Sequence, residues 1–318
     1  NLRKYELEGG STNSKSMAIP TLSVDSGMYL DKKLDFAGQA FTQTLEPRIF
    51  YSYTPYKNQE ALPMFDTALT DLNLESLFIE NQFVGSDRIM DSNQFTIAAT
   101  TRFIDNKGLE RLNATLAQRY YMSDRKVLKE AQYANSVIQS DSSDLFLTAT
   151  AYLNKALRVN GAIQYNPDES TTNRATFKAS YSPHPGKLID ASYRLIRNPI
   201  DINNDIKQIN LAGQWPIGQG FYTIGRYNYD IKQSRVVESL GGLEYDGGCW
   251  TSRLVLNRLA LATTEKPNYT LFMQIELGGL GSLGASNDSN LFDVLNRNVP
   301  GASFASNIPD QYRKENLN

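Results

Sequence analysis

Cysteine and histidine are almost missing from this sequence of 318 residues: Cys249 is the one cysteine and His184 the one histidine. A single thiol cannot close a disulfide within the chain. Hydrolysis by serine needs a base beside the nucleophile, and zinc sites draw on several Cys and His ligands. A carboxylate pair stays open among 34 acidic residues, although no spacing singles one out. We therefore predict no enzyme activity, no metal and no cofactor.

The sequence also lacks a charge surplus and a long apolar run. Its net charge is −2 and its pI about 5.6, so the basic surface of a nucleic-acid-binding protein is missing. No run of about 18 apolar residues occurs, which excludes a transmembrane helix. The chain opens at Asn1 without a Met or a basic signal region. We expect it to be a segment of a longer chain.

What the sequence has in abundance is alternation with a period of two. In RATFKASYS, residues 174–182, Ala, Phe and Tyr share one face, while Arg, Thr, Lys and Ser share the other, as in a pleated strand. Many such segments match the roughly 9 to 11 residues of a tilted bilayer crossing, and aromatics cluster at their ends. The pattern predicts about thirteen strands, near residues 18–30, 39–53, 94–104, 110–121, 144–155, 157–167, 174–182, 187–197, 206–215, 220–231, 234–245, 249–261 and 268–280.

The links between these segments alternate in length. Residues 57–93 and 122–143 are long links, whereas DNKGL and DGG are short turns. Outer-membrane barrels place long loops outside and short turns in the periplasm. We therefore predict an all-β fold, an antiparallel transmembrane β-barrel over residues 1–280, with Cys249 on the periplasmic side and a periplasmic tail over 281–318. Thirteen strands that start outside imply further strands upstream. A soluble sandwich or β-helix is the open alternative.

Charged residues on the polar strand faces would line a hydrated lumen and pair between neighbouring strands. Solvated, mutually neutralising lumen groups are the simpler interpretation, and contact with an anionic, amphiphilic cargo is the sharper one. The lumen residues that we single out are Glu46, Arg48, Arg102, Arg119, Arg226 and Glu276 on the strands, and Asp87 and Arg88 in the long link 57–93.

The long link 57–93 follows a segment with Pro47 in mid-strand, which is tolerated at an edge or a bulge. We expect the link to fold back over or into the barrel mouth, because apolar residues at this density would otherwise be exposed. Its predicted buried side consists of Phe65, Leu69, Leu72, Leu74, Leu77 and Phe78.

Several motifs resemble the C-terminal half of the LptD family of lipopolysaccharide-assembly outer-membrane proteins. They stand in the family's order between about residues 19 and 301, and they are LEPRIFYSYTPY, LPMFDTALTD, GSDRI, AGQWPI, GLEYDGGCW and NVPG. The resemblance implies a barrel of about 26 strands in the Gram-negative outer membrane, with its N-terminal half and a periplasmic domain outside this sequence.

The resemblance also implies a function. The family inserts lipopolysaccharide into the outer leaflet through a lateral opening between the first and last strands. Implied partners are lipopolysaccharide, a plug lipoprotein like LptE, a periplasmic Lpt bridge protein that reaches the missing domain, and outer-membrane lipids. A porin-like passive channel needs the same alternation and is the alternative.

Two sites follow from the resemblance. The last strand would be one lip of the opening, through Tyr269, Leu271, Met273, Ile275, Leu277, Gly278 and Gly279. The family carries adjacent cysteines that pair with its N-terminal domain. Cys249 matches one of them and Gly248 stands at the other, so at most one interdomain disulfide is implied. A free, buried thiol at Cys249 is the alternative.

Overall fold

The computed structural model describes most of the chain, and the structural statements below concern that part. The described residues are 2–5, 15–36, 38–60, 62–85, 87–130, 140–198, 204–260, 266–277, 281–284, 298–303, 308–309 and 311–312. The chain forms two compact units, the first comprising Asn1–Ala149 with Ile163–Thr172, and the second Thr150–Ala162 with Asn173–Asn318.

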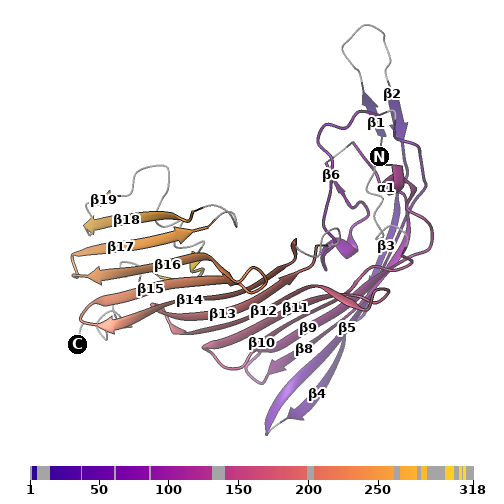
Figure 1. Ribbon diagram of the computed structural model, residues 1–318. Helices are drawn as coiled ribbons and strands as arrows, with labels where there is room; N and C mark the ends of the chain where they lie inside the picture. The colour runs from indigo at the N-terminus through magenta and orange to yellow at the C-terminus, as the bar shows by residue number, and fades with distance from the viewer. Residues whose placement is uncertain are drawn as a thin grey trace. The chain divides into compact units, whose positions relative to one another are not determined.

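Regular structure is almost entirely β (Figure 1). A sheet of fifteen strands has the order β19-β18-β17-β16-β15-β14-β13-β12-β11-β10-β9-β8-β5-β3, with β4 also paired to β5. The prediction of an all-β antiparallel fold is confirmed. Its strands are β3 (Leu22–Gly27), β4 (Leu30–Phe36), β5 (Gln39–Thr54), β8 (Ser92–Asp105), β9 (Glu110–Tyr121), β10 (Leu145–Tyr152), β11 (Leu157–Asn166), β12 (Thr171–His184), β13 (Lys187–Ile196), β14 (Ile206–Gly218), β15 (Phe221–Asp230), β16 (Arg235–Asp246), β17 (Trp250–Leu259), β18 (Asn268–Leu277) and β19 (Gly281–Gly284).

Short elements accompany the sheet. β1 (Leu2–Tyr5) pairs with β2 (Lys15–Ala18), and β6 (Ala68–Leu69) pairs with β7 (Phe83–Val84). The helical pieces are the 3-10 turn η1 (Ser76–Phe78) and α1 (Lys126–Glu130). No described helix has the length and apolar character needed to cross a membrane.

The first predicted strand, 18–30, contains β3 but is wrong in extent. β3 ends at Gly27 and β4 begins at Leu30, and the break lies beside Pro47 on β5. The Met28 amide donates to the Pro47 carbonyl across 3.0 Å, but Pro47 has no amide proton to offer in return. The ladder is therefore interrupted at this point and resumes in the same register, with Leu30 opposite Leu45. From β5 onward the predicted strands agree with the observed ones apart from their ends.

The two faces of the sheet are inverted relative to a soluble protein. On β5 of the first unit, Ile49 is 53% exposed. Thr44 and Ser52, which point to the opposite face of the same strand, are fully buried. A lone exposed apolar residue needs no explanation, but a contiguous apolar field marks contact with a membrane or a partner.

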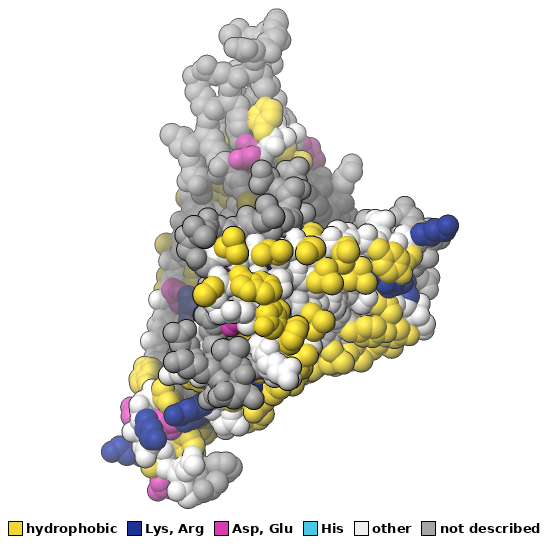
Figure 2. Space-filling model, turned by 90° about the vertical axis from the view of Figure 1, so that its left-hand side faces the viewer, with side chains coloured by type: hydrophobic (Ala, Val, Ile, Leu, Met, Phe, Trp, Pro, Cys, Tyr) yellow, Lys and Arg dark blue, Asp and Glu magenta, His cyan; other side chains and the backbone are white. Residues whose placement is uncertain are grey.

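The second unit repeats this inversion. The register places Leu243 on β16, Leu254 on β17 and Met273 on β18 side by side, and all three are exposed. Figure 2 shows hydrophobic side chains gathered over one face, with the charged ones mostly toward its borders. Further exposed apolar residues on the strands of this unit are Phe177, Tyr181, Ile189, Ile209, Leu211, Phe221, Tyr227, Leu256, Tyr269 and Leu271.

The opposite, polar face of the first unit carries a small core made with the long link. Leu77 is completely buried and packs with Ala98, Ala117 and Phe146. Partly buried side chains around it are Leu72, Leu74 and Phe78, and Leu69 packs against a neighbouring cluster. The predicted burial of the link's apolar side is thus confirmed for these residues within this unit, and its place at the barrel mouth stays a prediction. The inclusion of Phe65 is wrong, because its side chain is 75% exposed.

The polar face of the second unit is covered by a segment from the end of the chain. Val299 is fully buried and packs with Leu188 and Ala212. The Gln214 side chain donates to the Ser303 carbonyl at 2.6 Å and accepts the Ser303 amide at 2.8 Å. The region predicted as a tail therefore contributes β19 and this packed segment to the unit.

Candidate functional site

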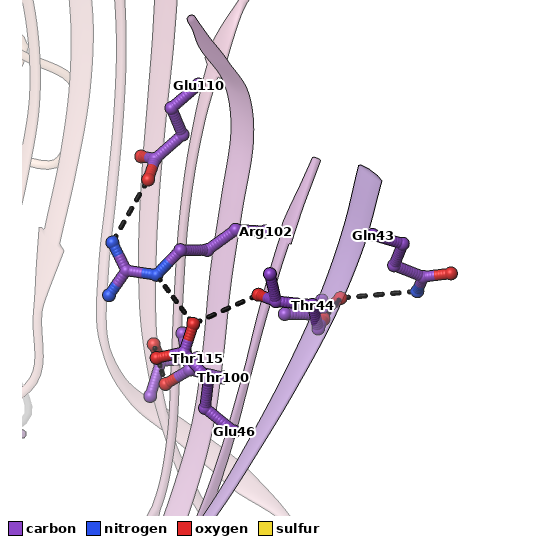
Figure 3. A network of polar contacts seen from close by, with 8 residues as sticks. Gln43, Thr44, Glu46, Thr100, Arg102, Glu110 and Thr115 are labelled. Carbon is purple, nitrogen blue, oxygen red and sulfur yellow. Dashed lines mark hydrogen bonds and ion pairs between the residues drawn. The ribbon is translucent and has the colours of Figure 1, made fainter. Parts of the chain in front are cut away.

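The polar face of the first unit carries a charged ladder across three strands. Arg102 on β8 donates from Nε to Glu46 Oε1 of β5 and from Nη1 to Glu110 Oε2 of β9, each across 3.0 Å (Figure 3). The register sets Thr44 opposite Arg102, and the Thr44 hydroxyl donates to Glu46 at 3.0 Å. Two predicted lumen residues, Glu46 and Arg102, are thus brought together and neutralise each other.

Arg48 lies further along β5 on this polar face. Its guanidinium pairs with Asp25 of β3 and stands 4.0 Å from the centre of the Phe78 ring. A cation over an aromatic face is attracted by the ring's quadrupole. Arg48 therefore joins the outermost strand to the folded link.

Arg119 on β9 is fully buried under the same link. Its Nη2 donates to the carbonyl of Ser76 at 2.8 Å and to that of Ile79 at 3.4 Å. A buried guanidinium with carbonyl acceptors is costly to remove, because the acceptors would lose their donor. The lumen residue predicted at this position thus fastens the link to the sheet.

Asp87 and Arg88 lie within the link and not on a strand. Asp87 Oδ2 accepts the amides of Phe65 at 2.6 Å and Asp66 at 3.0 Å, while Arg88 Nη2 donates to the Leu62 carbonyl at 3.1 Å. These two residues hold the backbone of the link in shape. Both residues thus belong to the long link, and their place in the lumen stays a prediction.

The second unit contains a ladder whose central residue the sequence reasoning missed. Arg253 on β17 has a side chain only 1% exposed, and it donates to Glu244 on β16 at 2.8 Å and to Glu276 on β18 at 2.9 Å. The alternation of TSRLVLN already places Arg253 on the polar face, which is the signal that could have found it. Glu276, a predicted lumen residue, is therefore one arm of a three-strand bridge.

Arg226 on β15 connects the polar face to the covering segment. Its Nε donates to Asn210 Oδ1 at 2.7 Å and its Nη1 to Asn298 Oδ1 at 2.5 Å, with Glu238 at 3.5 Å. The predicted lumen residue thus holds the chain end in place.

The carboxylate of Asp205 holds the two ends of the link between β13 and β14 together. The Asn198 amide donates to Asp205 Oδ1 at 2.9 Å, and Lys232 Nζ lies 3.6 Å from its other oxygen. The hydrogen bond from Asn198 lowers the pKa of Asp205 below its ordinary value, and the lysine adds to this. Asp205 is therefore an ionised carboxylate that connects the end of β13 to the start of β14.

The predicted gate strand β18 lies near one end of the strand order. β19 pairs only with its last part, Gln274–Leu277, so among the described residues Asn268–Met273 has a strand partner on one side alone. Leu271 is 66% exposed, and Tyr269 and Met273 point the same way. Of the other predicted gate residues, Leu277 is exposed and Ile275 half-buried, whereas Gly278 and Gly279 lie outside the described residues.

Cys249 lies in the turn between β16 and β17, and its thiol is exposed. The alternative of a buried thiol is therefore wrong. Gly248 beside it has φ +81°, a left-handed conformation that glycine adopts freely and a cysteine would not. The backbone of this turn thus accounts for glycine at the position where a second cysteine was considered.

His184 is the last residue of β12. The His184 ring stacks on the Tyr312 ring with centroids 4.7 Å apart. No three His, Cys, Asp or Glu side chains of the described residues gather into a metal site.

Comparisons with known proteins agree with the resemblance. The family model described as LPS transport system D matches residues 2–221. The LPS-assembly protein LptD of Thiobacillus denitrificans is 40% identical over 284 residues, covering 89% of this chain and 37% of that protein. The protein of the same name from Azoarcus is 36% identical over 307 residues, covering 94% of this chain and 36% of its own length. The chain thus spans little more than a third of these relatives. A mutant Rh. blastica porin matches at a TM-score of 0.34 with 14% identity, covering 84% of this chain and 92% of the porin, a similarity too low to support an argument.

Proposed function

The chain belongs to the LptD family of LPS transport proteins, and on this premise we propose that it forms part of the barrel that inserts lipopolysaccharide into the outer leaflet. Membership places the chain in the outer membrane of Gram-negative bacteria and among transport proteins, which confirms the prediction that it is not an enzyme.

The inverted faces of the sheet carry the proposal. Outward residues such as Ile49 and Leu254 are exposed, and the opposite face holds buried charged bridges such as that of Arg253. A lipid with a charged, sugar-bearing head needs a wet polar path for the head and an apolar boundary for the acyl chains. A passive porin-like channel would use the same faces, and family membership favours lipopolysaccharide assembly over it.

We propose that β18 is one lip of a lateral opening. Support comes from its half-paired edge, Asn268–Met273, because each ladder bond that is not made lowers the work of separating the strands. The other lip would be the first strand of the complete protein. The partners that we propose are a plug lipoprotein like LptE in the lumen and a periplasmic Lpt bridge protein that supplies lipopolysaccharide.

A cross-link across this opening is expected to stop delivery. A cysteine at Thr270, oxidised to a cysteine in the first strand of the full-length protein, should abolish new surface lipopolysaccharide while the barrel stays folded on a heat-shift gel. The matched control joins Thr270 to Asn257, its partner on β17, and should leave delivery intact. Normal surface lipopolysaccharide in fully cross-linked first-strand protein would contradict the gate.

We also propose that Cys249 forms a disulfide with the missing N-terminal domain. Its exposure leaves the thiol accessible, and disulfides persist in the periplasm. Residues 281–318 would lie on the same side, as supported by Ile308, which packs on Tyr222 beside a short turn.

The disulfide proposal has a direct test in the full-length protein. Cys249→Ser is expected to remove a mobility shift on a non-reducing gel, because the loop closed by an interdomain bridge is lost on substitution. Reduction of the unsubstituted protein should give the same mobility as the variant. Identical mobility of oxidised protein and variant would refute the bridge.

A further inference from the structure

A cavity of about 300 Å³ opens on the polar face of the second unit. It lies between the 153–156 turn, the strands β12 and β13, and the chain-end residues Pro300 and Gly301. Ligand pockets begin at about this volume, so the space suits one small chemical group. Its Pro300 and Gly301 belong to the NVPG motif.

Two polar atoms, on residues that line this cavity, are buried without a partner among the described residues. They are Ser180 Oγ and Asp190 Oδ1, on side chains whose residues are 8% and 3% exposed. The register sets Ser180 and Asp190 directly opposite each other on β12 and β13. Buried polar groups are almost always hydrogen-bonded, and an unmade bond is costly. A ligand that donates a hydrogen bond to the carboxylate and forms another with the hydroxyl would satisfy both groups.

Three further residues of the lining are cationic. Lys178 Nζ lies 2.9 Å from Asp190 Oδ2, which leaves Oδ1 open, and the exposed Lys155 and Arg158 stand at the rim. One carboxylate against three cations gives the cavity a positive balance. A ligand that fits must offer hydroxyls inward and an anionic group outward.

We propose that this cavity binds a single saccharide unit that carries an acidic group. The sugar hydroxyls would donate to Asp190 Oδ1 and bond Ser180 Oγ, and the acidic group would face Lys155 and Arg158. The proposal deepens the proposed transport function, on which its biological meaning rests, by locating a subsite for a sugar-bearing head on the polar path.

The covering segment forms one wall of the site. Pro300 and Gly301 line the cavity beside Leu188, and Val299 anchors them by packing on Leu188 and Ala212. Gly301 has φ +94° and needs its glycine backbone there. The site thus depends on the docked chain end as well as on β12 and β13.

The binding test uses glucose 6-phosphate as the probe, with full-length protein in detergent. The rate at which Lys155 is acylated is followed by mass spectrometry. Lys107, an exposed lysine in another short turn that is not part of the cavity lining, is the control. At a probe concentration twice the dissociation constant, acylation of Lys155 should slow about threefold by mass action, and that of Lys107 should not change. Equal slowing of both lysines would overturn the site. It would also be overturned if neither lysine slowed at probe concentrations up to 50-fold above a dissociation constant of about 1 mM, which we take as the weakest binding to a pocket of this kind.

Further arms separate the sources of binding. Glucose should protect Lys155 weakly and inorganic phosphate weakly, and Ser180→Ala should reduce the protection given by glucose 6-phosphate. The matched control Ser192→Ala alters a neighbour on β13 outside the cavity lining and should have no effect. Phosphate that protects as well as the sugar phosphate, or protection that Ser180→Ala leaves unchanged, would overturn the saccharide site. Surface lipopolysaccharide, measured separately in the same variants, tests the transport proposal without deciding the binding result.

Discussion

Replacing Arg253 with leucine is expected to lower the free energy of unfolding by about 3–5 kcal/mol, the range for removing one partner of a buried ion pair. Arg253 bridges Glu244 and Glu276, and its side chain is almost wholly buried. The variant would leave Glu244 buried without its cation, while Glu276, nearer to solvent, could be rehydrated. Unfolding of the full-length protein in guanidinium, followed by tryptophan fluorescence, would measure the change.

Two further variants distinguish the bridge from general damage. Arg194→Leu replaces an exposed arginine on β13 and should change stability by less than about 0.5 kcal/mol, as surface substitutions usually do. Adding Glu244→Leu to Arg253→Leu should restore part of the lost free energy of unfolding, because the buried Glu244 carboxylate that has lost Arg253 is then removed as well. Equal losses for Arg194→Leu and Arg253→Leu would refute the bridge.

Leu254→Arg is expected to destabilise the protein by about 2–4 kcal/mol in a bilayer, the cost of arginine on the lipid face near the midplane. Leu254 is 48% exposed in the middle of β17, between Leu243 and Met273. If this face met water instead, the same change would be nearly neutral. Unfolding in lipid vesicles would provide the measurement.

Leu277 offers a control matched in exposure. It is also 48% exposed, but it ends β18, where an arginine near the interface costs only about 0–1 kcal/mol. The difference between Leu254→Arg and Leu277→Arg therefore reports depth in the membrane. Equal effects at the two positions would contradict a lipid-facing sheet.

The strands were predictable because their signal is local. A pleated strand turns successive side chains to opposite faces, so a strict alternation such as that of 174–182 shows both the strand and its faces. The break between β3 and β4 was not visible in this way. It arises from the missing amide of Pro47 on another strand, some twenty residues further along the chain.

The site was predictable only in part. The polar-face positions of Glu46, Arg102, Arg226 and Glu276 follow from alternation, but the identity of each partner does not. Arg253 meets Glu276 because β17 and β18 pair in one register, and a slip of one residue would turn the two to opposite faces. The contacts of Asp87 and Arg88 with the backbone of the link likewise depend on how the link folds, which composition does not show.

The sequence by itself determined the all-β class, most strands, their apolar and polar faces, and membership of the family, since these depend on local periodicity and on motifs in order. Only the tertiary structure decided which charges pair, that Leu77 is buried while Phe65 is not, and that the chain end covers the polar face beside Ser180 and Asp190. These features depend on contacts between residues distant in the chain, and those contacts are set by strand register and by packing.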